Sequence, residues 1–450
     1  MIRFSQSSSN LLRYSGNAYQ FRFDKKGMIM NKELHDVLAG QNLLGDSYPS
    51  SYIADIFLND WEKAMKGEEA TCYFVPTYMS ATGTLKPGET VTVMDAGGTN
   101  FRVAQVRFGT DGKAEILKIK KSRMPGSGHP ITSEEMFGCF AQEILPMMTD
   151  SGKLAICFSY ACRCLPTHES EIIEMSKEVV VTDAPGKLVG KSIADALYKL
   201  GYSGNIETVV INDTVAVLYS ALCGGAKQAV AVILGTGENI AYAEKCSNFA
   251  VRPEGNAEWM FINTESAMLS VIKKAKIDAE IEAHSADIGK NSFEKMSSGA
   301  YIGEIIARSV VYLGENGFVS GKLKETAEKL VRFDMRDVGS FLESGTGTLK
   351  EACLDENDTE VLKEVCEQIE KRSGNLVAGN TAAGLIRMRK NGVRGVIPVA
   401  VNGSTILKAK IINTTFIEAL NSMKDRIGEY EIITDENDTI IGTAASVFLK

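Results

Sequence analysis

The stretch TVTVMDAGGTNFRVAQVRF, residues 90–108, decides the fold of this chain of 450 residues. Apolar residues alternate along both of its halves, and a Gly-Gly pair stands between them, which predicts a β-hairpin closed by a glycine turn. A second stretch, QAVAVILGTGENIAYAE at 228–244, repeats this layout of apolar strand, Gly and Thr in the turn, a following Asn, and apolar strand. Because the two turns lie about 140 residues apart, the sequence predicts an internally duplicated α/β architecture.

The segments outside the hairpins alternate between extended and helical patterns, as in a layered α/β protein. Further strands are predicted at 154–160, 207–212, within 394–405, and at 429–434. The predicted helices cover 31–70, 133–144, 213–222, 294–331, 355–390 and 411–427, with a last helix from Gly442.

Both glycine turns have the composition of a phosphate-binding loop. Glycine lets the backbone turn sharply and approach an anion closely, and the hydroxyl of Thr99 adds a donor. Asp95 precedes the first turn, where a carboxylate can hold Mg²⁺ directly or through water. Gly235, Thr236 and Gly237 offer the same donors to a second phosphate. An ordinary hairpin turn is the alternative for either turn taken alone.

Asn212-Asp213-Thr214 lies at a predicted strand-to-helix junction. Asp213 could be a simple helix cap, but a carboxylate at such a junction can also point into a cleft and accept a proton from a substrate hydroxyl. Polar residues on apolar segments could surround a sugar ring, although each alone also fits a solvated side chain. They are Ser159, Ser176, Lys177, Glu265 and Glu294.

Composition argues against several functions. The net charge of −8 disfavours binding to a nucleic-acid backbone, which requires a basic face. No apolar run approaches the roughly 20 residues of a membrane span. Nine cysteines without a CxxC pair, and four histidines that are not grouped, predict neither a disulfide framework nor zinc catalysis. We therefore expect a protein of the reducing cytoplasm that binds small molecules.

Five segments match the motifs of one known family in the same order. MDAGGTNFRV at 94–103, INDTVAVL at 211–218 and ILGTGENIAY at 233–242 closely resemble LDLGGTNFRV, VNDTVGTL and VGTGTNACY of the eukaryotic-type hexokinase family. FINTESA at 261–267 and FEKMSSGAYIGEI at 293–305 are similar to its INMEWGA and FEKMISGMYLGEI. The resemblance runs from about residue 46 to the C-terminus.

This resemblance implies the duplicated actin-like ATPase fold, an α/β fold related to ribonuclease H with two lobes around a central cleft. It implies phosphorylation of a hexose, with glucose as the first candidate, at the 6-hydroxyl by ATP and Mg²⁺. We expect a large lobe of residues 31–76 and 212–442 and a small lobe of 77–211 and 443–450. Residues 1–30 are predicted to form a loose extension, and Met28 or Met30 is an alternative start.

Site residues follow from the matching motifs. Asp213 would be the catalytic base for the sugar hydroxyl, and Asp95 would hold Mg²⁺ through water. The ring hydroxyls would be held by Ser159, Ser176, Lys177, Asn212, Asp213, Asn239, Glu265 and Glu294. The nucleotide would be held by Asp95, Gly97, Gly98, Thr99, Asn100, Arg102, Gly235, Thr236, Gly237, Gly403 and Ser404, the last two in a turn that resembles the family's adenosine loop.

The chain departs from the family pattern at three places. SKEV at 176–179 stands where the family has TKGF, Ser266–Leu269 stands where it has WGAF, and Asn402 replaces Asp. These changes keep a second function open, a non-catalytic sugar sensor on the same fold. An actin-like assembly ATPase would not need the Asn-Asp-Thr motif, and the Cys-rich zinc motif of bacterial sugar kinases is missing. The preferred hexose and the oligomeric state stay open.

Overall fold

Two mixed sheets form the framework of the protein in the computed structural model, which describes residues 12–14, 32–98, 100–175, 179–254 and 257–450. The five-stranded sheet has the order β5 (Ala114–Arg123), β4 (Asn100–Phe108), β3 (Thr90–Ala96), β6 (Lys153–Phe158), β9 (Glu207–Ile211). The seven-stranded sheet has the order β1 (Leu12–Tyr14), β14 (Tyr430–Thr434), β13 (Ile397–Asn402), β10 (Val230–Leu234), β11 (Glu238–Lys245), β12 (Trp259–Asn263), β2 (Val75–Pro76). A separate hairpin joins β7 (Ala161–Cys164) and β8 (Ser170–Glu174).

The two sheets share one topology, which confirms the predicted duplication. In the smaller sheet β3 is antiparallel to β4 and parallel to β6, and β6 is parallel to β9. In the larger sheet β10 is antiparallel to β11 and parallel to β13, and β13 is parallel to β14. A glycine turn follows the first strand of each unit, so the two predicted phosphate loops occupy equivalent positions.

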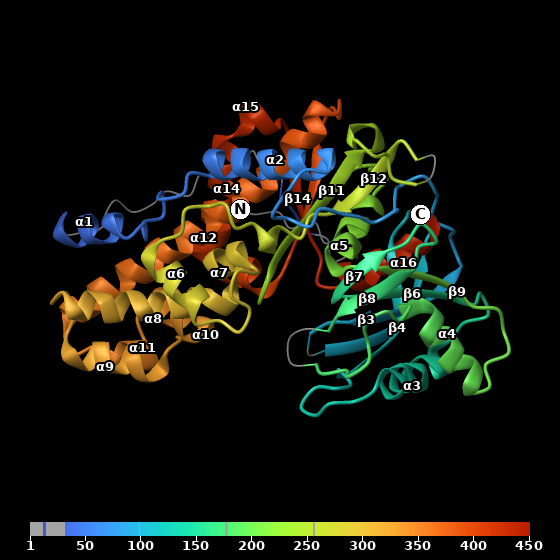
Figure 1. Cartoon of the computed structure of the whole chain (residues 1–450), viewed down its shortest axis with the longest axis horizontal. Coiled ribbons are helices and arrows are strands. Elements are labelled where there is room, and N and C mark those ends of the chain that lie inside the picture. Colours follow the sequence, from blue (N-terminus) through green and yellow to red (C-terminus); the bar gives the residue numbers. More distant parts are fainter. Residues whose placement is uncertain (1–11, 15–31, 99, 176–178, 255–256) are drawn as a thin grey trace, which may run out of the picture.

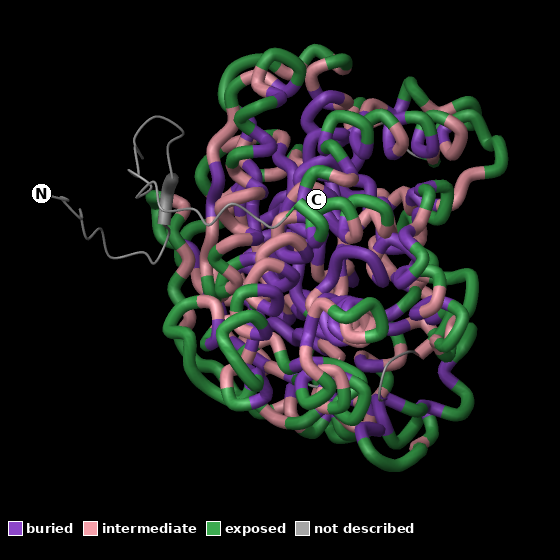
Figure 2. The backbone as a smooth tube through the Cα atoms, turned by 90° about the vertical axis from the view of Figure 1, so that its left-hand side faces the viewer, coloured by how far each residue is buried: buried purple, intermediate pink, exposed green. Residues whose placement is uncertain are grey.

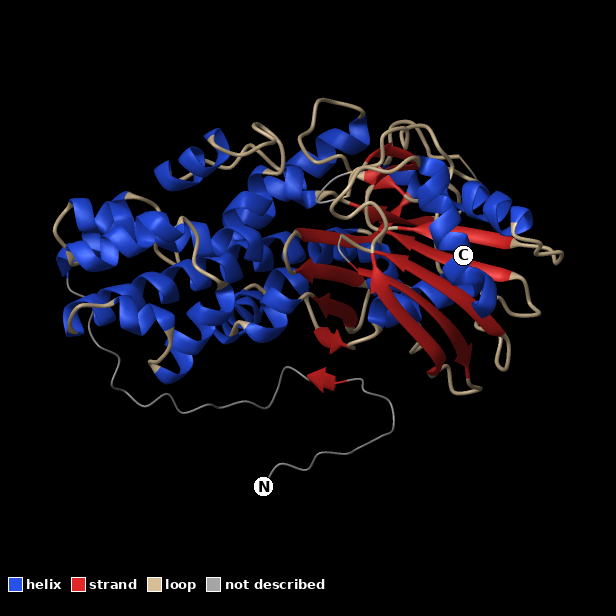
Figure 3. Ribbon diagram, turned by 90° about the horizontal axis from the view of Figure 1, so that it is seen from below, coloured by secondary structure: helices blue, strands red, loops and turns tan. Residues whose placement is uncertain are grey.

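Most helices gather toward one end of the molecule and the strands toward the other (Figure 3). Figure 1 shows α3 and α4 beside the smaller sheet, and α6 to α11 grouped at the opposite end. Their bounds are α1 Lys32–Gly40, α2 Ser50–Lys66, α3 Ser133–Ile144, α4 Val189–Lys199, α5 Asp213–Leu222, α6 Lys276–Ala283, α7 Ser292–Ser297, α8 Gly299–Glu315, α9 Gly321–Leu330, α10 Met335–Ser344, α11 Thr348–Ala352, α12 Glu356–Lys390, α13 Ser404–Lys408, α14 Lys410–Ser422, α15 Lys424–Ile427 and α16 Asp438–Leu449, with single 3₁₀ turns at Leu145–Met147, Cys246–Asn248 and Ser266–Met268.

Helices α5 and α16 join the two halves of the core. One buried cluster combines Val93 of β3, Ala231 of β10, Val215 of α5 and Ala444 of α16. In Figure 2 such buried segments run through the centre of the molecule. Because the two sheets share this core, they are held together by packed elements rather than by a loose linker.

The sequence prediction was wrong about the start of the last helix. The helix α16 begins at Asp438, four residues before Gly442. A Cβ atom on Gly442 would lie 1.7 Å from the carbonyl oxygen of Ala216 on α5, so this glycine marks a close contact between the two helices. The predicted helix at 294–331 is interrupted as well, between α7 and α8 and between α8 and α9.

The described helices were also compared with the dimensions of a bilayer. None of those in the described ranges combines the length and the apolar character that a membrane crossing requires.

Candidate functional site

The first glycine turn joins β3 to β4 and is closed by backbone bonds. The amide of Gly97 donates to the carbonyl of Asn100 at 3.0 Å, and the hydroxyl of Tyr160 donates to the carbonyl of Gly97 at 2.7 Å. Asn100 is exposed, and Gly98 is half-buried. Thr99, the predicted hydroxyl donor, lies outside the described residues. The carbonyls of Gly97 and Asn100 are therefore used inside the protein, and Asn100 is the exposed residue of the described part of the turn.

Asp95, the last polar residue before this turn, is buried and forms an ion pair across the hairpin with the partly buried Arg102. The Nε of Arg102 donates to Oδ2 of Asp95 at 2.7 Å, and its Nη2 donates both to Asp95 and to Oγ1 of Thr439 at 2.7 Å. Burial raises the pKa of Asp95, while the charge of Arg102 opposes the shift. Arg102 thus connects the first turn to α16.

The residues around Asp95 fit a magnesium ion that is held mainly by water and phosphate. Within the described ranges, no three His, Cys, Asp or Glu side chains come together as a metal site. Mg²⁺ usually keeps several waters and uses one or two carboxylates together with substrate phosphates. Asp95, near the end of β3, supplies one such carboxylate.

The second glycine turn joins β10 to β11 and packs against two helix starts. The carbonyl of Gly235 accepts from the amide of Gly299 at 2.9 Å and from Oγ1 of Thr405 at 2.8 Å. Gly403 has φ +111°, and a Cβ atom there would lie 2.2 Å from the carbonyl oxygen of Leu234, so only glycine fits this contact. The structure therefore brings together the predicted turns at 235–237 and 403–404.

Two exposed hydroxyls lie on this face, those of Thr236 and Ser404. Ser404 is the first residue of α13, whose N-terminus is capped by Gly403. Asn402 points elsewhere, because its side-chain amide donates to Asp438. Burial raises the pKa of Asp438 to about 8, so this carboxyl, held by an amide, is neutral at pH 7.

Asp213 occupies the first turn of α5 and is not its cap. Asn212 caps the helix, since its Oδ1 accepts from the amide of Thr214 at 2.8 Å. The hydrogen bonds that Asp213 makes within the described residues all reach Oδ1, from the amide and the hydroxyl of Thr214 at 2.8 and 3.3 Å. Asp95 of β3 pairs with Cys157 of β6, and Cys157 pairs with Ile211 of β9, so Asp213, two residues later, lies at the same end of the sheet as Asp95. The negative charge of Asp213 contributes to the raised pKa of Asp95.

A chain of amides links Asp213 to the predicted sugar residues. Nδ2 of Asn239 donates to Oγ1 of Thr214 at 3.1 Å and to Oδ1 of Asn263 at 2.7 Å. Nδ2 of Asn263 donates in turn to Oε1 of Glu265 at 2.6 Å. Glu265 has φ +49°, which turns the chain sharply at the end of β12.

Glu294 and Ser159 approach the same region from other elements. Oε2 of Glu294, on α7, accepts from the amide of Glu238 at 3.2 Å, and a Cβ atom on Gly237 would lie 2.6 Å from it. Ser159 follows β6, and its amide donates to the carbonyl of Ala96 at 3.1 Å, beside the first turn. Ser176 and Lys177 lie outside the described residues.

Comparison with known proteins decides the family. Two sequence models described as Hexokinase match the chain, one over residues 50–223 and the other over 229–449. Hexokinase-7 of Oryza sativa is 30% identical over 333 residues, which cover 67% of this chain and 71% of the rice protein. The chain belongs to the hexokinase family of phosphotransferases.

Other hexokinases agree with this assignment. Human Hexokinase-3 is 28% identical over 367 residues, and the match covers 76% of this chain and 38% of the human protein. The chain thus spans well under half the length of that relative. A solved hexokinase of Schistosoma mansoni in complex with glucose superimposes with a TM-score of 0.75 and 22% identity, covering 92% of this chain and 98% of that one. This likeness confirms the predicted fold.

Sequence reasoning missed several residues around the candidate site. Glu238, Ser266 and Asn380 are buried and hydrogen-bonded beside Asn239, Thr439 of α16 accepts from Arg102, and Asp438 accepts from Asn402. The Glu in GTGEN, which stands where the family motif has Thr, was a usable signal for Glu238. Asn380 lies inside a helix of 35 residues, where no local pattern distinguishes it.

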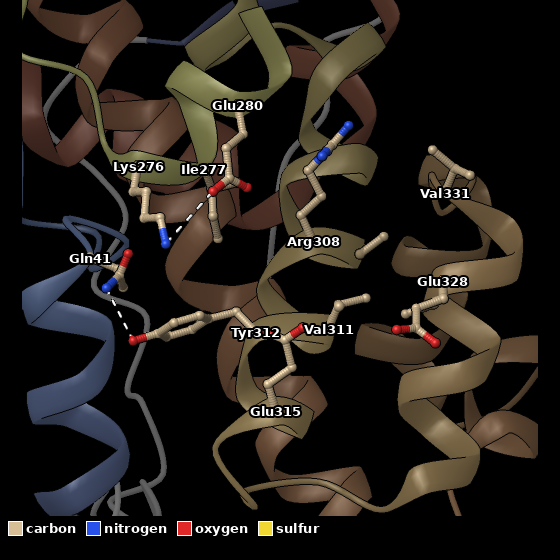
Figure 4. A pocket seen from close by; sticks show the side chains of 12 residues that line it. Gln41, Lys276, Ile277, Glu280, Arg308, Val311, Tyr312, Glu315, Glu328 and Val331 are labelled. Atoms are coloured by element: carbon tan, nitrogen blue, oxygen red, sulfur yellow. Dashed lines mark hydrogen bonds and ion pairs between the residues drawn. The ribbon is translucent and has the colours of Figure 1, made fainter. Parts of the chain in front are cut away.

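A separate groove lies outside the hexokinase site, between α1, α6, α8 and α9 (Figure 4). Its volume is about 440 Å³. Tyr312 reaches across it, and its hydroxyl accepts from Nε2 of Gln41 at 3.1 Å. Lys276, Arg308 and Glu328 also line it, so the walls carry charges of both signs.

Proposed function

We propose that the chain transfers the γ-phosphoryl group of ATP to the 6-hydroxyl of a hexose, with glucose as the first candidate. The observation that carries this proposal is the arrangement of Asp213. Its carboxyl group lies near Asp95 at the first glycine turn, and it is linked through Thr214 to Asn239 beside the second. A base between phosphate-binding turns and hydroxyl-binding amides suits phosphoryl transfer to an alcohol.

Asp213 would act as the catalytic base. Thr214 holds Oδ1 through two hydrogen bonds, which leaves Oδ2 to accept the proton of a sugar hydroxyl. The transition state of phosphoryl transfer is loose, so the main task of this group is to orient the attacking oxygen. The proton would pass to Asp213 as the new bond to phosphorus forms.

The ring hydroxyls would be bound by neutral amides together with carboxylates. Asn239, Glu265 and Glu294 come from three different elements and approach one region, and Asn212 lies beside Asp213. Amide and carboxylate groups in fixed positions discriminate between sugar hydroxyls, because each donor and acceptor must find its partner. Ser159, which follows β6, remains a predicted contact, as do Ser176 and Lys177, which lie outside the described residues.

The nucleotide would lie across the two glycine turns. Arg102 with the turn at 97–98 would contact the phosphates on one side, and the turn at 235–237 on the other. Gly403 and Ser404 would receive the adenosine, as their resemblance to the family's loop implies. Asp95 would hold Mg²⁺ through water, and the ion supplies neutralisation of the phosphate charge when bound.

The direct test is a panel of sugars at a fixed concentration of MgATP, with ADP formation as the readout. We expect turnover with at least one hexose and a product phosphorylated at the 6-position, identified by phosphorus NMR. Asp213→Asn measured beside the wild type excludes a contaminating kinase. Glucose binding without ADP formation, with any hexose, would instead identify a non-catalytic sugar sensor.

A further inference from the structure

Glu238 is a buried carboxyl group that neither the phosphate turns nor the proposed base requires. It is the first residue of β11, it stands between Gly237 and Asn239, and only 2% of it is exposed. The hexokinase motif quoted above has Thr at this position. A buried carboxyl is costly unless it is hydrogen-bonded, so its partners show what it does.

Two neutral side chains hold this carboxyl. Nδ2 of Asn380 donates to Oε1 of Glu238 at 2.5 Å, and Oγ of Ser266 lies 3.0 Å from Oε2. Asn380 is itself fully buried, and its Oδ1 has no hydrogen-bond partner within the described residues. The side chain of Asn380 therefore contributes its amide nitrogen as a hydrogen-bond donor to the carboxyl of Glu238.

Ser266 connects this carboxyl to the sugar site. Its Oγ lies 3.3 Å from Oδ1 of Asn239 and accepts from the amide of Ile240 at 3.2 Å. A serine hydroxyl has one proton and two lone pairs. It can therefore donate to Glu238 or to Asn239, but not to both at once.

We propose that Glu238 is a positioning residue of the hexose site, which sets the orientation of the Asn239 amide through the hydroxyl of Ser266. This inference rests on the proposed function. When Glu238 is protonated, its O–H donates to Oγ of Ser266, and the proton of Ser266 goes to Oδ1 of Asn239. Nδ2 of Asn239 is then kept toward Thr214 and Asn263, the arrangement that the distances show.

Ionisation of Glu238 changes the group to which the hydroxyl of Ser266 donates its hydrogen bond. The carboxylate draws the proton of Ser266 to itself, and Asn239 loses a donor to its Oδ1. The backbone amide of Ser266, at 3.3 Å, and the hydroxyl of Thr264, at the longer distance of 3.5 Å, then remain as donors to that oxygen. The amide of Asn239 is held less firmly, and its hydrogen bonds to a sugar hydroxyl become weaker.

The surroundings of Glu238 favour the protonated form at neutral pH. Burial raises its pKa to about 8, and the charges of Glu294 on α7 and Glu265 after β12 add to the shift. The thiol of Cys72 also lies close enough for Glu238 to raise its pKa. Asn380 from α12 is neutral. The switch therefore falls just above neutral pH.

The test uses two variants and two matched controls. Glu238→Gln keeps the shape of the side chain and donates to Ser266 at every pH, and Ser266→Ala removes the connecting hydroxyl. Glu370→Gln is the control for the glutamate, because burial raises the pKa of Glu370 to about 7 at a site ten residues before Asn380 on α12. Ser309→Ala is the control for the serine, since Ser309 is buried in α8 and donates to the carbonyl of Ile305.

Glucose affinity is measured by calorimetry without ATP between pH 6.5 and 9, after thermal unfolding has shown that each variant is folded. We expect the wild-type Kd to rise about 3- to 10-fold above pH 8, and the Glu238→Gln profile to be flat. Ser266→Ala should show the raised Kd already at pH 7, while both controls follow the wild type.

Three results would overturn the positioning role: a flat wild-type profile, a Glu238→Gln profile that repeats the wild-type rise, or a normal Kd for Ser266→Ala at pH 7. In each case the wild type still binds and phosphorylates a hexose, so the proposed function stands. Failure of the wild type to bind any hexose overturns both.

Discussion

The proposed phosphate side of the site, around Asp95, and its proposed sugar side, around Glu238 and Asn239, hold their buried carboxyl groups differently. Asp95, beside the first glycine turn, is paired with the guanidinium of Arg102. Glu238, which precedes Asn239 on β11, is held by the neutral side chains of Ser266 and Asn380. A triphosphate brings several negative charges, so a cation is useful near it. A sugar brings only neutral hydroxyls, so no cation is needed to balance a charge there.

The difference implies separable effects on the two substrates. A change on the phosphate side should alter the KM for ATP and leave the binding of hexose in the absence of ATP intact. A change on the sugar side should weaken the binding of hexose and leave the KM for ATP unaltered. Asp213 belongs to both, because it lies near Asp95 and is linked through Thr214 to Asn239.

The largest effect is expected for Asp213→Asn, which removes the base but keeps the size of the side chain. The rate kcat should fall about 10²- to 10⁴-fold, because general-base catalysis contributes that much. The Kd for glucose should change far less, since Asn239, Glu265 and Glu294 remain. Steady-state kinetics and calorimetry give the two values.

Asp334→Asn is the matched control, because Asp334 caps α10 and lies at the surface, where it pairs with Arg336. It should leave kcat unchanged. A kcat of Asp213→Asn within threefold of the wild type would remove the base from the mechanism.

The position of Asp213 also shows how much of the fold and of the candidate site could be predicted from the sequence. Its motif predicts the strand, the junction and the start of α5 at the observed residue, because the hydrophobic periods of strand and helix change there. The same logic located both glycine turns and the hairpins around them. These features are local, so a short window of sequence contains the information.

Non-local features could not be predicted in this way. Asn380 reaches Glu238 across 142 positions of the sequence, and Thr439 reaches Arg102 across 337. Gly442 looks like a helix start in the sequence, although it is the contact point between α16 and α5. Such pairings depend on how the two sheets pack, which no local pattern contains.

The second-largest effect is expected for Arg102→Ala, which removes the guanidinium that pairs with Asp95 on the proposed phosphate side. Asp95 would stay buried without its partner, so the free energy of unfolding should fall by about 3 kcal/mol. The KM for ATP should rise at least about 10-fold, and the Kd for glucose without ATP should stay within twofold. Urea unfolding, kinetics and calorimetry measure the three quantities.

Arg336→Ala provides the comparison, since the Arg336 side chain in the exposed pair with Asp334 is 90% exposed. Exposed pairs contribute less than about 1 kcal/mol, so this variant should match the wild type. An equal loss of glucose affinity and ATP affinity in Arg102→Ala would contradict the separation of the two sides.

A smaller effect is expected for Asp438→Asn, which removes the raised-pKa carboxyl beside Arg102. The pKa of Asp438 is about 8 in the folded protein, against an ordinary value of 3.8. Between these values the folded chain keeps a proton that the unfolded chain has lost, so stability falls as pH rises through that window. The variant should reduce the drop in Tm between pH 5 and pH 8.5 by about 4 °C.

Calorimetric scans at the two pH values measure this drop, and Glu238→Gln should reduce it for the same reason. The two variants should differ in how they bind glucose, because only Glu238→Gln changes the way in which glucose affinity depends on pH. If Asp438→Asn, and not Glu238→Gln, abolished the pH dependence of the glucose affinity, then Asp438 rather than Glu238 would be the group that controls it.

The smallest effect is a compaction of the protein on binding hexose. Asn239, Glu265 and Glu294 belong to the larger sheet and its helices, whereas Ser159 follows β6 of the smaller sheet. A sugar that contacts both sets would draw them together and exclude water, a competing acceptor of the phosphoryl group. Small-angle scattering should show a slightly smaller radius of gyration with D-glucose and no change with L-glucose, which has the same composition. Glu294→Ala should weaken the response to D-glucose and shift it to higher concentration. If a saturating concentration of D-glucose left the radius unchanged in the wild type, water would have to be excluded by the local packing around Asp213 rather than by closure between the sheets.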